Sequence, residues 1–411
     1  MSDNKKLRIF STICVALVIF ALYSDGIIFT SFREDHTESI LKVKRQTNPS
    51  ISTPRNNINI RLQSIKGDFS VARKKAIYNN PFIPPFNATE EERIAWLRRK
   101  LPKLEIFKSD LLTKRFHSRV LQFFNPECEV RVFMTWISPV TSFGNREFLA
   151  LESLFKAHPK GCLMILSRTM DSVEGYRILK PLIDRRFKVN AATPDLSFLF
   201  KDTPAENWLG DLEKGNKDPG EISLAQNLSN LMRLAILYKY GGIYLDTDFI
   251  VLKPLNGLRN SIGAQSIDLL SKNWTRLNNA VLIFDMNHPL LLKFIEEFAS
   301  TFDGNRWGYN GPYLVSRVVQ RVEPRPGSNF TVLSPMAFYP VDWTKIGGLF
   351  KRPEREAQLR WVKAKVLQLS GETYGVHLWN RQSSGLLIEE GSVIGRLISD
   401  HCVTCKGIYS S

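Results

Sequence analysis

The segment from Ser223 to Leu252 constrains the fold more than any other part of the sequence. Apolar residues recur at helical spacing through its first half, and Gly241 and Gly242 then follow, where glycine suits the left-handed end of a helix. The short apolar run from Ile243 to Leu245 comes next, and Asp-Thr-Asp follows it before the apolar run resumes at Phe249. This order predicts a buried helix, a short buried strand and two carboxylates at the strand's end. The residues at helical spacing are Leu224, Leu228, Leu231, Ala235 and Tyr238.

Strands and helices alternate in the sequence before this segment. Buried strands are expected over Val130 to Trp136 and over Cys162 to Leu166, because both runs are apolar. A helix is expected between them, over Glu147 to Ala157. A third strand is expected to start at Phe187 to Asn190. The alternation predicts an α/β fold, with a parallel sheet covered by helices on both faces.

Asp246 and Asp248 are the strongest candidates for a functional site. Side chains two residues apart in an extended chain point to the same face. Two neighbouring carboxylates at the end of a buried strand repel each other unless a cation lies between them. Mg²⁺ and Mn²⁺ prefer oxygen ligands and often bind substrate phosphates as well. We therefore expect Asp246 and Asp248 to hold a divalent metal that binds the diphosphate of a nucleotide sugar and assists its departure.

Two alternatives remain for this pair. An isolated Asp-x-Asp is commonly a solvated turn, but here hydrophobic strands flank it on both sides. A glycosidase also uses two carboxylates, which lie about 5 to 9.5 Å apart across a sugar and usually come from separate elements. The spacing of Asp246 and Asp248 suits a metal clamp better than an acid and a nucleophile.

A polar stripe runs along the preceding helix. Gln226, Asn230 and Arg233 lie at i, i+4 and i+7, opposite the leucines. The stripe is either a solvated face or a row of groups directed at a nucleotide sugar, with Arg233 neutralising charge on the phosphates. Tyr238 and Tyr244 are further candidates for donor binding.

The N-terminus predicts a membrane anchor. Lys5, Lys6 and Arg8 precede an uncharged apolar run from Ile9 to Tyr23. The positive flank should keep this end in the cytosol, which gives a cytosolic tail over 1–8 and a single type II signal anchor over 9–28. A cleaved signal peptide is the alternative.

A basic stem is expected after the anchor, over residues 29–115. The stretch from Lys42 to Lys75 is polar and basic, and Asp68 is its only acidic residue. A charged helix should follow from about Thr89 to Arg99, with Thr89 as its N-cap and Glu92 three residues later. The folded body should start near Phe116, with a nucleotide-sugar-binding half over 116–265 and an acceptor-side half over 266–411.

The formal net charge of +16 is compatible with an anionic membrane, an anionic substrate or simply a basic surface. We find no zinc-finger spacing or RNA-binding aromatic signature, so no nucleic-acid partner is expected. Four of the five cysteines lie outside the apolar N-terminal run and favour two structural disulfides over a zinc or redox site, although the pairing stays open. These four are Cys128, Cys162, Cys402 and Cys405.

Glycosylation sequons support a lumenal body. They occur at Asn87, Asn227, Asn273 and Asn329. We expect Asn227 to be unused, because a glycan there would obstruct the polar stripe.

Several ordered motifs resemble the α-1,4-glycosyltransferase family, in particular its plant branch. The run from Ser229 to Lys253 is similar to the family's Asp-x-Asp sugar-binding region, and the similarity extends over roughly Val130 to Cys405. Downstream it continues through Asn278 in L-N-N-A, W-G-Y-N-G-P from Trp307 to Pro312, A-F-Y-P from Ala337 to Pro340, and Y-G-V-H-L-W-N from Tyr374 to Asn380.

The resemblance implies a GT-A, Rossmann-like fold and a retaining hexose transfer from a nucleotide sugar, UDP-linked by preference, to a glycolipid or glycan hydroxyl. It implies Mn²⁺, or Mg²⁺, on Asp246 and Asp248, with His377 as a third ligand or else packed beside Trp379. It also implies a Golgi membrane protein with a lumenal catalytic domain. Asn278, Trp307, Gly308 and Gly311 would shape the acceptor side.

One position departs from the family pattern. Many relatives carry aspartate where this chain has Asn230, so the donor sugar, of galactose or N-acetylhexosamine type, stays open. The alternative function is a membrane-anchored scaffold that binds a carbohydrate or nucleotide without turnover.

Overall fold

The computed structural model describes residues 81–322 and 329–409. The chain divides into two compact units, and the described part of the first is only residues 354–360. Apart from the first residues of helix α14 (Glu356–Glu372), everything below concerns the second unit. The expected signal anchor, the cytosolic tail and the basic stretch of the stem lie outside the described residues. Among the residues that are described, we find no helix with the length and apolar character needed to cross a bilayer.

The secondary structure alternates between helices and strands. The strands are β1 (Arg131–Thr135), β2 (Cys162–Leu166), β3 (Lys188–Ala192), β4 (Gly242–Leu245), β5 (Phe249–Val251), β6 (Ser261–Ile267), β7 (Trp274–Phe284), β8 (Thr331–Leu333) and β9 (Gly375–His377). The α-helices are α3 (Glu90–Lys100), α4 (Leu111–Lys114), α5 (Phe116–Phe123), α6 (Asn145–Ala157), α7 (Val173–Ile183), α8 (Leu196–Phe200), α9 (Pro204–Glu213), α10 (Leu224–Tyr240), α11 (Pro289–Thr301), α12 (Pro312–Val322), α13 (Pro335–Phe338), α14 (Glu356–Glu372), α15 (Asn380–Ser383) and α16 (Val393–His401). Short 3₁₀ helices are η1 (Leu101–Lys103), η2 (Glu105–Phe107), η3 (Val140–Ser142) and η4 (Ile346–Phe350).

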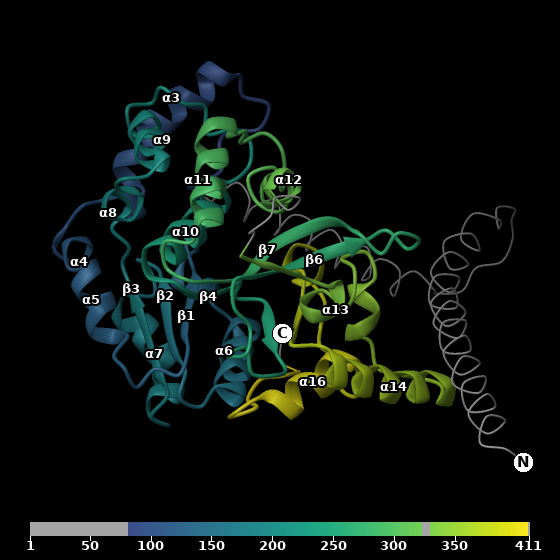
Figure 1. The fold of residues 1–411 in the computed structure, drawn as a ribbon. Coiled ribbons are helices and arrows are strands. Elements are labelled where there is room, and N and C mark those ends of the chain that lie inside the picture. The colour runs from purple at the N-terminus through teal and green to yellow at the C-terminus, as the bar shows by residue number, and fades with distance from the viewer. Residues whose placement is uncertain (1–80, 323–328, 410–411) are drawn as a thin grey trace, which may run out of the picture. The chain divides into compact units, whose positions relative to one another are not determined.

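A seven-stranded sheet in the order β3-β2-β1-β4-β7-β6-β8 forms the centre of the fold (Figure 1). Strands β3, β2, β1 and β4 are parallel, as the alternation of strands and helices predicted. Strand β7 runs antiparallel to both β4 and β6, so the sheet is mixed rather than parallel throughout. The antiparallel pairing of β6 with β7 follows from their short connection, which can only join antiparallel neighbours.

Helices cover both faces of the sheet. Phe133 and Tyr244 belong to a core that contains residues of α10 and α11, whereas Val132 and Leu245 belong to a second core that contains residues of α6 and α7. Neighbouring residues of a strand thus face opposite layers, as the pleat of a sheet requires. Figure 1 shows α10 and α11 on one side of the sheet and α6 and α7 on the other. The α/β architecture is confirmed.

The local predictions from sequence agree closely with the structure. Strand β2 has the predicted bounds, and β1, α6 and β4 begin or end within two residues of theirs. Helix α3 starts at the predicted cap, where the Thr89 side chain accepts from the Glu92 N–H and Glu92 contacts the Thr89 N–H in return. Residues 90–114, which the sequence analysis assigned to the stem, are largely helical, and Trp96 and Leu97 are buried in the core.

Two disulfides form among the four cysteines. They join Cys128 to Cys162 and Cys402 to Cys405. The first ties the start of β2 to the segment before β1, and the second lies after α16 near the end of the chain. The prediction of structural disulfides is confirmed, and the pairing that the sequence left open is resolved.

Candidate active site

The two aspartates lie in a tight turn at the carboxyl end of β4. The Asp246 N–H donates to the Ala280 carbonyl of β7 over 2.9 Å, and the Phe249 N–H donates back to the Asp246 carbonyl over 3.2 Å. Strand β5 then leaves the turn and pairs antiparallel with β9, in a register that sets Phe249 opposite His377. A segment about 130 residues later in the chain is therefore placed against the Asp-x-Asp turn.

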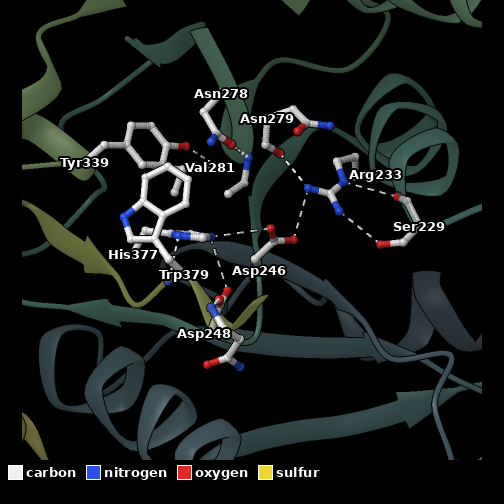
Figure 2. Close-up of polar contacts among 12 residues, drawn as sticks. Ser229, Arg233, Asp246, Asp248, Asn278, Asn279, Val281, Tyr339, His377 and Trp379 are labelled. Carbon is white, nitrogen blue, oxygen red and sulfur yellow. Dashed lines mark hydrogen bonds and ion pairs between the residues drawn. The ribbon is translucent and has the colours of Figure 1, made fainter. Parts of the chain in front are cut away.

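Asp246, Asp248 and His377 form a cluster that could hold a divalent metal. One ligand atom from each lies within 4.8 Å of the others. The His377 Nε2 is 3.3 Å from the Asp248 Oδ1 and 3.8 Å from the Asp246 Oδ2, and both carboxylates face it in Figure 2. Two carboxylates and one imidazole suit Mn²⁺ and related divalent ions, so the residues fit the metal that the sequence implied.

The His377 ring is held with Nε2 toward the carboxylates. The backbone nitrogen of Trp379 lies 3.1 Å from Nδ1, and the Trp379 ring packs edge-to-face against the imidazole at 4.5 Å between centroids. The packing on Trp379 that the sequence offered as one alternative is present, and Nε2 also faces the carboxylates, as the metal-ligand alternative requires. Burial lowers the pKa of His377, but the charges of Asp248 and Asp246 and their hydrogen bonds outweigh it and raise the pKa to about 9.

Asp248 is buried and held by the backbone. Its Oδ2 accepts from the Asn380 N–H over 2.8 Å, and its own carbonyl accepts from the Leu378 N–H over 2.8 Å. Burial alone would raise the pKa of the Asp248 carboxyl, but His377 and the Asn380 N–H lower it, so the carboxylate is ionised and ready to bind a cation.

Arg233 binds Asp246 rather than lying open to a substrate. Its Nη1 is 3.0 Å from the Asp246 Oδ1 and 2.8 Å from the Asn279 carbonyl. Nε donates to the Ser229 carbonyl and Nη2 to the Ser229 Oγ, over 3.1 and 3.0 Å. The side chain is only 3% exposed and also stacks on the Tyr244 ring. The sequence placed Arg233 on the phosphates, whereas the structure shows its N–H groups engaged in holding Asp246 (Figure 2).

Tyr244 also helps to hold the Asp246 carboxylate in place. It is fully buried on β4, and its hydroxyl donates to the Asp246 Oδ1 over 3.0 Å. Thr135 at the end of β1 lies 2.8 Å from that hydroxyl and 2.6 Å from the Ser229 Oγ, which extends the polar network around the Asp246 carboxylate. Burial raises the pKa of Tyr244 well above its usual range, so it remains a hydrogen-bond donor.

A cavity of about 760 Å³ opens in front of the cluster. Gln226 and Asn230 of the polar stripe line it, together with Asp246, Asp248 and His377. Asn230 is 4% exposed and accepts from the Asn279 Nδ2 over 2.9 Å. The stripe therefore faces the cavity and not bulk solvent.

The predicted acceptor-side residues belong to the same cavity, and we call their part of it the acceptor wall. Asn278, Trp307 and Gly308 line the cavity. Gly311 lies against Asn230, because a Cβ added to it would stand 2.8 Å from the Asn230 Oδ1. Only glycine allows this close approach, so the turn after Trp307 packs directly on the polar stripe.

The structure does not bring Tyr238 to this cavity. Its carbonyl accepts from the Asn287 N–H, and its side chain lines a separate hollow of about 350 Å³ with His117 and Phe198. Tyr238 follows Asn230 by eight residues along α10, roughly 12 Å at the rise of an α-helix, which places it near the far end of α10.

Sequence reasoning assigned no site role to several residues that line the cavity. They are Thr135, Trp136, Ser229, Gln265, Arg276, Asn279, Tyr313, Trp343, Trp379 and Arg381. Some lie beside the motifs that were recognised: Tyr313 follows W-G-Y-N-G-P, and Trp379 and Arg381 follow His377. Gln265 and Arg276 come from the β6–β7 pair, where no local pattern marked them.

The sequons differ in accessibility. Asn227 is 3% exposed, and its Oδ1 accepts from the Asn310 Nδ2 over 2.9 Å, so a glycan cannot be attached there without opening this contact. Asn87, Asn273 and Asn329 are exposed. The expectation that Asn227 is unused agrees with its burial.

Two protein-family models match most of the chain from residue 144 onward. The model described as "Glycosyltransferase sugar-binding region containing DXD motif" matches residues 144–267, and that described as "Alpha 1,4-glycosyltransferase conserved region" matches residues 283–409. The two matches together include Asp246, Asp248 and His377.

Relatives of similar sequence include two named transferases. Lactosylceramide 4-alpha-galactosyltransferase of Rattus norvegicus is 34% identical over 267 residues, which are 62% of this chain and 69% of that protein. Alpha-1,4-N-acetylglucosaminyltransferase of Homo sapiens is 29% identical over 220 residues, 51% of this chain and 58% of that protein. An uncharacterized protein of Arabidopsis thaliana is 32% identical over 296 residues, which are 70% of this chain but only 44% of the longer relative.

Solved structures resemble the chain less closely. The PaToxG glycosyltransferase has a TM-score of 0.36 and 16% identity over 56% of this chain and 80% of that one. The bacterial N-acetylglucosamine transferase NleB has a TM-score of 0.30 and 16% identity over 50% of this chain and 90% of that one. These TM-scores are too low to support a conclusion.

Proposed function

The chain belongs to the α-1,4-glycosyltransferase family, and on that premise we propose that it transfers a hexose from a nucleotide sugar to a hydroxyl of a glycolipid or glycan, with retention at the anomeric carbon. The observation that carries the proposal is the cluster of Asp246, Asp248 and His377 at the wall of a cavity of about 760 Å³. A cavity of this volume is in the usual range for a small-molecule site.

We propose Mn²⁺, with Mg²⁺ as the alternative, as the ion held by Asp246, Asp248 and His377. Bound there, the ion would neutralise the diphosphate and act as a Lewis acid on the departing nucleoside diphosphate. The chain's own residues prepare this site. Arg233 and Tyr244 fix the Asp246 carboxylate, and the Asn380 N–H fixes that of Asp248. Outer contacts of this kind commonly hold metal ligands in position.

The polar stripe would bind the donor. Gln226 and Asn230 line the cavity beside the cluster, and both amides can donate to and accept from sugar hydroxyls. Because Asn230 is neutral, it offers hydrogen bonds without the charge of the aspartate that many relatives carry. Galactose and N-acetylhexosamine donors, linked to UDP, both remain within the proposal, since the named relatives include transferases of each kind.

Retention does not require a covalent intermediate here. Among the described residues that line the cavity, the only carboxylates are Asp246 and Asp248, and the proposal assigns both of them to holding the metal ion. No further carboxylate is placed to attack the anomeric carbon. We therefore propose that the acceptor hydroxyl attacks on the face from which the nucleoside diphosphate leaves, so that its bond to the anomeric carbon replaces the bond to the diphosphate and its proton passes to the departing phosphate oxygen.

The compartment is part of the proposal. Two disulfides and three exposed sequons support an oxidising compartment in which N-glycosylation takes place. We propose a Golgi membrane protein with a type II anchor over 9–28 and a GT-A-type lumenal domain. Its two halves, 116–265 and 266–411, would each contribute to the site, because Asp246 and Asp248 come from the first and His377 and Trp307 from the second.

The test is calorimetric titration of the full-length chain with nucleoside diphosphates and nucleotide sugars, with and without Mn²⁺. We expect one nucleotide to bind only with Mn²⁺, and Asp248→Asn to abolish that binding while the protein stays folded. Asp184→Asn is the matched control, since Asp184 is an exposed partner of Lys180 on α7, away from the cavity. Absence of nucleotide binding in folded wild-type protein, or undiminished binding by Asp248→Asn, would refute the proposal.

A further inference from the structure

The cavity has a second polar region, on its acceptor wall. Arg276 of β7 lies there with its guanidinium 4.5 Å from the centroid of the Tyr313 ring. The Tyr313 ring is 41% exposed, so one of its faces is covered by the arginine while part of it remains open to the cavity. In the part of the chain that the structure describes, Arg276 has no carboxylate partner.

The position of Arg276 follows from the strand that carries it. The Asp246 N–H bonds to the Ala280 carbonyl, and Arg276 precedes Ala280 by four residues along β7. At about 3.3 Å per residue, Arg276 starts roughly 13 Å from the Asp-x-Asp turn. Asn278 lies between them and also lines the cavity. The backbone of Arg276 thus stands well apart from the carboxylates that would hold the diphosphate.

The charge of the lining is uneven. Its only acidic side chains are Asp246 and Asp248, and these face Arg233 and His377. Outside that cluster the charged side chains of the lining are Arg276 and Arg381, and Arg381 stacks on Trp307 at 3.6 Å. No acidic side chain of the lining accompanies Arg276 on the acceptor wall.

Exposed aromatic rings accompany the two arginines. Trp307, Tyr313 and Trp343 line this wall and are 48%, 41% and 42% exposed. These rings offer flat apolar faces on which a sugar ring can stack. Rings for a sugar and the Arg276 guanidinium for an anion therefore line the same cavity.

From this wall we propose that the acceptor carries an anionic group, a carboxylate or a phosphate, and that Arg276 stacked on Tyr313 binds it. The planar guanidinium donates two parallel hydrogen bonds to either group, and the ring beneath it holds the fork in one orientation. This inference rests on the proposed transferase function and specifies its acceptor. Arg276 and Tyr313 then act as specificity residues, while the metal cluster serves the donor.

The test uses oligosaccharides in matched pairs on an array. Members of each pair differ only by a uronic acid in place of a hexose, or by a phosphate ester in place of a hydroxyl. Full-length protein, loaded with Mn²⁺ and UDP, should bind the anionic member of a pair at least about tenfold more tightly than its neutral partner, the usual gain from a hydrogen bond to a charged group. Whether carboxylate or phosphate pairs show the preference identifies the source of the charge.

Variants separate this inference from the donor site. Arg276→Gln should bring the ratio of the affinities for the anionic and the neutral member of a pair close to one. Tyr313→Phe, which keeps the ring, should retain the preference for the anionic member. Arg259→Gln is the control for lost positive charge, because Arg259 is 78% exposed and lies outside the cavity lining. Equal binding of anionic and neutral members, no binding of any anionic member, or an unchanged preference in Arg276→Gln overturns the inference if UDP still binds with Mn²⁺. Loss of UDP binding in the wild-type protein would instead remove the proposed function itself.

Discussion

Replacing Arg233 by lysine separates the two roles that this residue could have. Lysine keeps the positive charge near Asp246 but loses the guanidinium fork, which makes contacts of 2.8 to 3.1 Å with Ser229, Asn279 and Asp246. Losing two or three such hydrogen bonds in a side chain that is 3% exposed should lower the free energy of unfolding by about 2–3 kcal/mol. Because Arg233 orients a metal ligand, Mn²⁺ should also bind roughly 10- to 100-fold more weakly.

The assay is titration of the variant with Mn²⁺ alone, without nucleotide, beside urea unfolding of the metal-free protein. Arg119→Lys is the matched control, because Arg119 makes a similar double contact to Asp171 and bonds the Ala191 carbonyl, away from the cavity. It should lose stability and keep its affinity for Mn²⁺. If Arg233→Lys binds Mn²⁺ as the wild type does and loses only affinity for the nucleotide, the guanidinium contacts the phosphates and the structural argument is refuted.

Three further outcomes follow from the geometry. Asp248 and Asp246 outweigh the effect of burial and raise the pKa of His377 to about 9, so Mn²⁺ binding at pH 7 should release close to one proton. In the metal-free protein, the pairing of protonated His377 with the two carboxylates should stabilise the fold fully below about pH 6.5, and this stabilisation should be lost as the pH rises through about 9. Calorimetry in buffers of different ionisation enthalpy checks the proton release, and urea unfolding across this pH range checks the stability. Burial opposes ionisation of Asp171, but Arg119 and Thr193 lower its pKa below 3.8, so its contribution is present above that pH and is lost as the pH falls below it, and Asp171→Asn should show a flatter acid limb in urea unfolding. Gly311→Ala would place a methyl 2.8 Å from the Asn230 Oδ1 and should weaken nucleotide-sugar binding with little change in Mn²⁺ binding, as titration with each would show.

Local elements could be predicted because their causes are local. The five apolar residues of β2 stand between a glycine and a serine, and α10 shows its buried face in the spacing of its leucines and its end in Gly241. The Asp-x-Asp pair was recognisable because it ends a strand too apolar to be exposed. All of this is information within about 20 neighbouring residues.

The direction of polar side chains could not be predicted in the same way. The spacing of Gln226, Asn230 and Arg233 shows that they share a face of α10, but not what that face meets. Asn230 meets Asn279 of β7 and the cavity, whereas Arg233 extends to Asp246 and the Asn279 carbonyl. That difference depends on how β7 packs beside β4, a contact between segments about 35 residues apart in the chain. The same holds for Arg276, which gains its position from the β6–β7 pair.

The metal cluster depends most on a contact that no local pattern contains. His377 reaches the carboxylates because β9 pairs with β5 in the register that sets it opposite Phe249. A shift of one residue would turn the imidazole to the opposite face, since side chains alternate along a strand. Three backbone contacts oppose that shift: the Leu378 N–H bonds to the Asp248 carbonyl, the Asn380 N–H to the Asp248 carboxylate, and the Leu252 N–H to the Tyr374 carbonyl. Asp248 is thus both a ligand and part of what positions the third ligand. Weaker metal binding in an Asp248 variant would therefore have two causes, the lost carboxylate and a less ordered His377. Comparing two variants separates these causes, because Asp248→Asn retains the acceptor oxygen for the Asn380 N–H and Asp248→Ala does not.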